Sequence, residues 1–147
     1  MKYLHFLALT LILVACKTYS DEDLKNFDKQ IQEFMTKKGL KMDASPSGLY
    51  YKINPKGEGR NVLYQDSIVV TYEGKLLNGE IFDRQKDPIT FALKDMIGGW
   101  KEALLMMKKG DEIELLIPPQ LGYGEHKLDD IPQHSILYFN MKLLDLK

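Results

Sequence analysis

Residues 67–83 read SIVVTYEGKLLNGEIFD, a strand-length run followed by a turn. The segment 67–77 is rich in β-branched residues, which suit the pleated, half-buried surface of a sheet. Asn78-Gly79 comes directly after it and favours the tight turn of a β-hairpin, because both residue types tolerate positive φ. This stretch predicts an antiparallel sheet.

Similar short alternating segments recur from residue 48 onward. The further strand candidates are residues 49–53, 112–117 and 136–146. Between them, apolar side chains at spacings of three and four predict one short amphipathic helix that closes at Lys108-Lys109-Gly110. Its apolar positions are Ile97, Trp100, Leu104 and Met107. We therefore expect an α+β fold in which an antiparallel sheet wraps around one helix.

The composition leaves room for one globular domain with short appendages. The chain has 147 residues, of which 44% are hydrophobic and 28% charged. The 20 basic residues nearly balance the 21 acidic ones, and neither sign is gathered into a block. Nucleic acid is therefore not an expected partner.

The N-terminus has the layout of a secretory signal. Residues 1–2 are Met-Lys, and residues 6–15 are apolar apart from Thr10. A membrane-spanning helix needs about 20 apolar residues to cross roughly 30 Å of hydrocarbon, so this run is too short. It ends in LVAC at 13–16, which resembles the bacterial lipobox. We expect residues 1–15 to be a signal peptide and Cys16 to be the lipidation site, the alternative being a chance cysteine at an ordinary cleavage site.

Cys16 is the only cysteine, so the chain has no internal disulfide. Acyl chains contribute about 0.8 kcal/mol per buried CH₂, so a multiply acylated Cys16 would anchor a domain without spanning the membrane. The expected location is extracytoplasmic, on a bacterial membrane, with the outer membrane favoured and surface exposure left open. Residues 16–23 would be the lipidated cysteine and an acidic linker. Its run Ser20-Asp21-Glu22-Asp23 resembles surface-routing signals of some bacterial lipoproteins, or is simply a helix N-cap.

A helix and connector are expected over residues 24–47. An apolar stripe at spacings of three and four indicates the helix, and Gly39 is placed to end it. The stripe consists of Leu24, Phe27, Ile31 and Phe34. It could pack on the chain's own domain or support dimerisation through residues 22–38.

Four ordered blocks within residues 48–147 resemble the FK506-binding-protein (FKBP) type of peptidyl-prolyl cis/trans isomerase. The blocks are VVTYEG at 69–74 with NGEIFD at 78–83, MIGGW at 96–100, IPPQLGYG at 117–124, and IP at 131–132 leading to LYF at 137–139. The resemblance implies a half-open antiparallel sheet curled around the helix, with a proline site between the helix and the concave sheet face.

The resemblance also implies roles for individual residues. The substrate-binding set would be Tyr72, Phe82, Ile89, Phe91, Met96, Ile97, Trp100 and Phe139. Trp100 would form the floor. In the catalytic set, Asp83 would sit at the rim, Tyr123 would point its hydroxyl at the substrate carbonyl, and Ile131 would donate its backbone N–H. The chain departs from the family at Ile89, where an aromatic residue is usual, and at Gln133, where a second proline is common.

Such residues suit bond rotation without a nucleophile. Twisting a peptide bond is opposed by about 18 to 20 kcal/mol, and water stabilises the planar form through hydrogen bonds to its carbonyl. A dry aromatic pocket should favour the less polar twisted form. No cofactor or metal is expected, and His126 and His134 lack metal-site spacing and should face solvent.

The expected function is isomerisation of X-Pro bonds in exported or cell-envelope proteins. Expected partners are proline-containing polypeptides and the membrane, and macrolides of the FK506 type could also bind. Alternatives are a non-catalytic proline-binding chaperone, an assembly lipoprotein of an envelope machine such as gliding motility, or a spacer whose helix is the interaction surface. Taken singly, Trp100 could be ordinary core, and Tyr123 and Asp83 ordinary turn residues.

Overall fold

The computed structural model describes residues 19–147; the predicted signal peptide, Cys16 and the first residues of the linker lie outside this range. In chain order the elements are α1 (Asp21–Lys38), β1 (Asp43–Ala44), β2 (Tyr50–Asn54), β3 (Glu58–Asn61), β4 (Ser67–Leu76), β5 (Ile81–Ala92), the 3₁₀ turn η1 (Leu93–Asp95), α2 (Gly98–Leu104), β6 (Lys108–Lys109), β7 (Glu112–Ile117), the 3₁₀ turn η2 (Pro119–Leu121) and β8 (Leu137–Leu146). Within residues 19–147 there is no helix long and apolar enough to cross a membrane.

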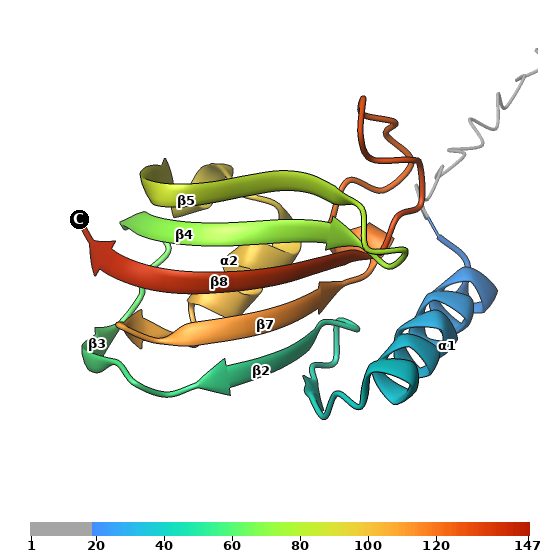
Figure 1. Ribbon diagram of the computed structural model, residues 1–147, viewed down its shortest axis with the longest axis horizontal. Helices are drawn as coiled ribbons and strands as arrows, with labels where there is room; N and C mark the ends of the chain where they lie inside the picture. The colour runs from blue at the N-terminus through green and yellow to red at the C-terminus, as the bar shows by residue number, and fades with distance from the viewer. Residues whose placement is uncertain (1–18) are drawn as a thin grey trace, which may run out of the picture.

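Six strands form one antiparallel sheet in the order β1-β2-β7-β8-β4-β5, and β3 pairs separately with β6. Figure 1 shows α2 lying across one face of the sheet. Helix α1 lies beside the strand ends at the right of the view. The predicted α+β class and the four predicted strands are confirmed. Buried positions alternate along β4, because every second side chain faces α2.

The hairpin predicted at Asn78-Gly79 is present and joins β4 to β5. Gly79 adopts φ 94°, and its N–H donates to the Leu76 carbonyl at 2.9 Å. The return strand β5 was not among the predicted strands. It is an edge strand whose register shifts against β4 between Val70 and Tyr72, so its exposure does not alternate regularly. The Asn78-Gly79 turn was the sequence signal that a second strand, β5, follows.

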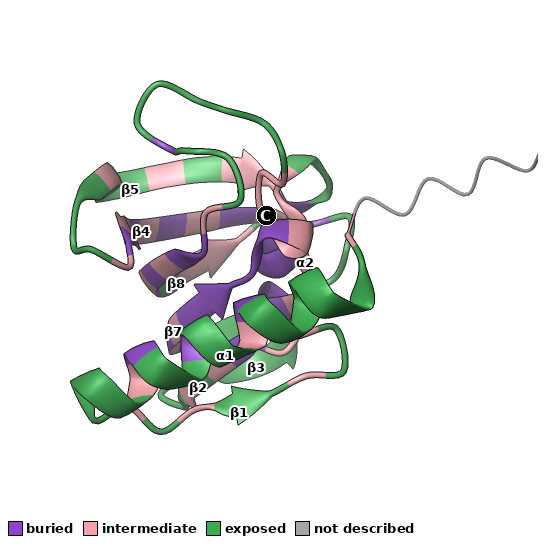
Figure 2. Cartoon of the chain, turned by 90° about the vertical axis from the view of Figure 1, so that its right-hand side faces the viewer, coloured by how far each residue is buried: buried purple, intermediate pink, exposed green. Residues whose placement is uncertain are grey.

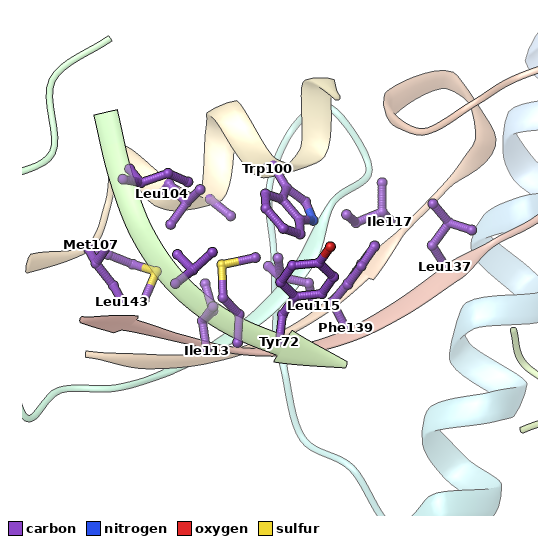
Figure 3. Packing of buried hydrophobic residues seen from close by; sticks show 14 of the residues in the cluster. Tyr72, Trp100, Leu104, Met107, Ile113, Leu115, Ile117, Leu137, Phe139 and Leu143 are labelled. Atoms are coloured by element: carbon purple, nitrogen blue, oxygen red, sulfur yellow. The ribbon is translucent and has the colours of Figure 1, made fainter. Parts of the chain in front are cut away.

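The main core lies between α2 and the sheet (Figure 3). It includes the fully buried side chains Leu104, Met107, Leu115, Ile117 and Leu143. Met107 contributes although α2 already ends at Leu104, so the predicted helix end at Lys108-Lys109-Gly110 is wrong.

Asp111 explains why the chain leaves the helix there. Its side chain is only 4% exposed. One carboxylate oxygen accepts the N–H of Lys108 at 2.8 Å, and the other accepts those of Lys56 and Gly57 at 3.0 and 2.7 Å. These bonds hold Lys108 and Lys109 extended as β6, which apolar periodicity could not indicate.

Helix α1 begins at Asp21, three residues before the expected start and inside the expected linker, and it ends at Gly39 as expected. Ser20 and Asp23 form a reciprocal capping box, and Gly39 ends the helix at φ 66°. The buried residues Phe27, Ile31 and Phe34 pack against Tyr50, Leu116 and Ile136. Because Leu115 faces the main core and Leu116 faces α1, this second cluster lies on the opposite side of the sheet. Figure 2 shows the exposed side of α1 turned to solvent. The stripe therefore packs on its own domain except for Leu24, which is exposed. Dimerisation through residues 22–38 stays a prediction.

We expect Asp111→Ala to lower the free energy of unfolding by about 3 kcal/mol, because three backbone N–H groups lose a charged acceptor in a buried place. Urea denaturation followed by circular dichroism measures this. Asp43→Asn, a change of an exposed carboxylate on β1, is the control and should shift stability by no more than about 0.5 kcal/mol. Equal effects of the two changes would contradict the role given to Asp111.

Candidate functional site

A hollow of about 500 Å³ lies between α2, the sheet and the long loop that follows η2. Its lining residues are Tyr72, Phe82, Asp83, Phe91, Asp95, Met96, Ile97, Trp100, Tyr123, Leu128, Asp129, Asp130, Ile131 and Phe139. We call it the aromatic cleft. Every predicted site residue within the domain lines it except Ile89, which packs against the main core from β5.

The rings meet edge to face around Trp100. Its ring centroid lies 5.0 Å from that of Tyr72, 5.4 Å from Phe139 and 6.0 Å from Phe91, with interplanar angles of 81°, 80° and 74°. Phe82 packs on Phe139 at 5.4 Å. Three strands, β4, β5 and β8, and the helix α2 thus contribute to one floor and its walls, where the aromatic set predicted from the sequence comes together.

Two glycines allow this close packing. A Cβ on Gly74 would lie 2.6 Å from ring atoms of both Phe139 and Phe82. A Cβ on Gly99 would lie 2.6 Å from a methyl group of Ile117. Gly74 therefore lets the two phenylalanine rings lie over β4, and Gly99 lets α2 approach β7 closely enough for Trp100 to reach the floor.

The cleft contains two tyrosine hydroxyls that differ in their hydrogen bonding. Tyr72 donates to Oδ2 of Asp83 at 2.5 Å. Burial, followed by the bond to Asp83, raises the pKa of Tyr72 far above its ordinary 10.0. Burial and then the charge of Asp83 also raise the pKa of Tyr123. Within residues 19–147 the Tyr123 hydroxyl has no hydrogen-bond partner, so it remains a protonated donor for a bound group.

The predicted donor role of Ile131 meets an obstacle. Its N–H is directed at the Leu128 carbonyl at 3.4 Å, and Leu128 donates back to the Ile131 carbonyl at 3.0 Å. A substrate would have to displace this long hydrogen bond. Ile97 offers a simpler donor: it is the N-cap of α2, and no acceptor for its N–H occurs in the described part of the chain. The first N–H groups of a helix lack intrahelical partners, which was the signal for this donor in the sequence.

The alternative interpretations, Trp100 as an ordinary core residue and Tyr123 and Asp83 as ordinary turn residues, do not account for the geometry of the cleft. Trp100 is 4% exposed, yet its indole N–H has no partner among residues 19–147, unlike the usual satisfied core tryptophan. Tyr123 lines the cleft half-buried. His126 and His134 are exposed as expected, and the described residues contain no group of three or more potential metal ligands.

A larger hollow of about 1010 Å³ lies over the outer face of the sheet. Its lining includes the charged residues Lys52, Glu73, Arg84, Glu114 and Lys142. Several of them are already paired, Lys52 with Glu114 and Arg84 with Glu73. It lacks an enclosed aromatic floor, and we assign the candidate site to the aromatic cleft despite its smaller volume.

Raising the pH above 10 should destabilise the fold through Tyr72. An unfolded tyrosine ionises near 10.0, whereas the raised pKa of Tyr72 keeps its proton in the fold. The unfolded state then binds fewer protons, so this contribution to stability is complete below pH 10 and is lost as the pH rises. In urea denaturation between about pH 8 and pH 11, Tyr72→Phe should lose stability less steeply than the native chain. Tyr64→Phe removes an exposed hydroxyl as the control. An unchanged slope in Tyr72→Phe would disprove the assignment.

Comparisons with known proteins agree with this geometry. The family pattern of the FKBP-type peptidyl-prolyl cis-trans isomerases matches residues 59–144. FkpA of Buchnera aphidicola subsp. Schizaphis graminum is 44% identical over 121 residues, covering 80% of this chain and 47% of the relative. FkpA of Escherichia coli K12 is 37% identical over 134 residues, covering 89% and 48%. The chain thus spans about half the length of these curated relatives.

Solved structures show the same fold. The crystal structure of FkpA from Escherichia coli superposes with a TM-score of 0.74 at 35% identity, covering 86% of this chain and 62% of that one. The crystal structure of AtFKBP13 gives a TM-score of 0.68 at 30% identity, covering 74% and 100%. Sequence pattern, fold and cleft agree, and the chain belongs to the family of FKBP-type peptidyl-prolyl cis-trans isomerases.

Proposed function

We propose that this chain catalyses cis/trans isomerisation of X-Pro bonds in exported or cell-envelope polypeptides. The observation that carries the proposal is an aromatic cleft in which two donors, the Tyr123 hydroxyl and the Ile97 N–H, have no protein acceptor among residues 19–147. The substrate class follows from the family.

Desolvation accounts for part of the rate. The proline ring would lie on Trp100 between Tyr72 and Phe139, whose rings leave little room for water. The planar amide is the more polar form, so removing water from its carbonyl raises the ground state more than the twisted state. A millionfold acceleration requires roughly 8 kcal/mol in total.

The two donors without a protein acceptor would supply the rest of the acceleration through oriented hydrogen bonds. The Tyr123 hydroxyl and the Ile97 N–H can donate hydrogen bonds to carbonyl groups on either side of the proline. Hydrogen bonds that are stronger to the twisted chain than to the planar one lower the barrier to bond rotation. Asp83 fixes Tyr72 in the wall through their hydrogen bond. Rotation about the bond requires no proton transfer. The raised pKa values of Tyr72 and Tyr123 extend the pH range over which both hydroxyls stay protonated donors.

Tyr123→Phe is expected to lower kcat/KM about tenfold, the equivalent of one lost donor worth about 1.4 kcal/mol, with little change in Tm. Asp83→Ala should act in the same direction by freeing Tyr72. The measurement is a proline-peptide isomerisation assay on the 147-residue chain, with Tyr64→Phe as the matched control. An FK506-type macrolide should compete with the peptide.

The same assay tests the alternative of a non-catalytic binding module. A folded native chain that binds proline peptides but gives no acceleration at micromolar concentration would leave only a chaperone or assembly role. A large drop in Tm for Tyr123→Phe would instead mean that this side chain is mainly structural.

We further infer that the chain is exported and held on a membrane through Cys16. The support comes from the sequence alone: the apolar run at 6–15 and the LVAC sequence at 13–16. The capping box at Ser20 and Asp23 explains the acidic run equally well as a helix start, so surface display rests on a resemblance only.

Cys16→Ser should move the protein from the membrane pellet to the soluble fraction and abolish labelling by radioactive palmitate, since the thiol is the acylation site. Thr18→Ser, a change of similar size two residues away, is the control. Membrane retention of the Cys16→Ser protein after a high-salt wash would refute lipid anchoring at this residue.

A further inference from the structure

We propose that the aromatic cleft selects prolyl bonds with a lysine or arginine close to the proline, through carboxylates at its rim. This inference rests on the proposed function and specifies its substrate class. The rim carboxylates, which we call the acidic rim, are Asp83, Asp95, Asp129 and Asp130.

The acidic rim comes from three separate segments around one opening. Asp83 lies on β5, Asp95 ends η1, and Asp129 and Asp130 lie in the loop between η2 and β8. No lysine or arginine is among the residues that line the cleft. Asp95, Asp129 and Asp130 are exposed and take part in no ion pair within residues 19–147.

The nearest cations do not neutralise this rim. Arg84 follows Asp83 along β5, but its guanidinium pairs with Glu73, away from the cleft. The Lys101 ammonium donates to the Lys94 carbonyl at 3.3 Å. Lys127 lies in the same loop as Asp129, yet it does not line the cleft. The opening therefore presents negative charge to an incoming peptide.

Two features indicate that a bound chain occupies the hollow beside the acidic rim. The indole N–H of Trp100, a residue 4% exposed, is unpartnered within the described chain and belongs to the same hollow. Figure 3 shows this nitrogen on the side of the indole turned toward Tyr72. Leu128 lines the cleft beside Asp129 and is 41% exposed. The methylene stem of a lysine or arginine can pack on such an apolar side chain while its charged end reaches the carboxylates.

The expected preference is moderate and depends on salt. Each exposed ion pair contributes little, but several carboxylates around one opening add up, and the Debye length of about 30 Å at 0.01 M salt leaves them unscreened. We expect kcat/KM to be about tenfold higher for a lysine-bearing peptide than for its glutamate counterpart at low salt. At 1 M salt, where the Debye length is about 3 Å, the ratio should fall to about two.

The test compares proline peptides that differ only in having Lys, Gln or Glu beside the proline, on either side of it. NMR exchange measures isomerisation by the 147-residue chain directly and avoids the sequence preference of a coupling protease. The test variant combines Asp95→Asn, Asp129→Asn and Asp130→Asn. Asp83 is left in place because it holds Tyr72. The control variant makes the same charge change at exposed positions elsewhere, with Glu22→Gln, Asp43→Asn and Glu58→Gln.

The test variant should reduce the Lys to Glu ratio from about ten to about two, because Asp83 alone keeps its charge, and the control variant should keep the native ratio, since only the rim charges face the peptide. Equal rates for the Lys and Glu peptides in the native chain, with the Gln peptide turned over, would overturn this inference and leave the proposed function standing. Absence of turnover for all three peptides would overturn the proposed function and this inference with it.

Discussion

The packing of Trp100 against the sheet is the contact on which the site depends. Its ring centroid lies within 6.0 Å of those of Tyr72, Phe91 and Phe139. That closeness requires α2 to approach β7 at Gly99, where a methyl group would collide with Ile117. A helix held even slightly farther away would open the hollow to water, and a water-filled hollow would no longer favour a twisted amide.

The two faces of the sheet contact different helices. One face packs on α2 and carries the cleft, while the opposite face receives α1 through Phe27, Ile31 and Phe34. The sheet is therefore covered at both places where its apolar residues would meet water. Asp111 lies just before the start of β7 and accepts three backbone N–H groups, which holds the segment between α2 and β7 in place.

Charge and burial are separated within the site. The floor and walls are aromatic, and burial raises the pKa values of the Tyr72 and Tyr123 hydroxyls. The acidic rim remains in solvent, where its carboxylates can stay charged at little cost. A peptide would thus meet charge first and lose water afterwards, which separates recognition of the flanking residues from rotation of the bond.

The local sequence alone determined the strands β2, β4, β7 and β8, the caps of α1 and the set of aromatic residues, because these depend on alternation, on capping chemistry and on motif spacing. Tertiary structure decided the rest. β5 does not alternate regularly because it is an edge strand with shifted register, and α2 ends early because Asp111 binds the N–H of Lys108. The N–H of Ile131 is occupied by Leu128, while that of Ile97 has no acceptor within residues 19–147. Tertiary structure decides these points because it sets the strand register and the loop positions: Asp111, for example, is held by Lys56 and Gly57, which lie 55 and 54 positions away in the sequence.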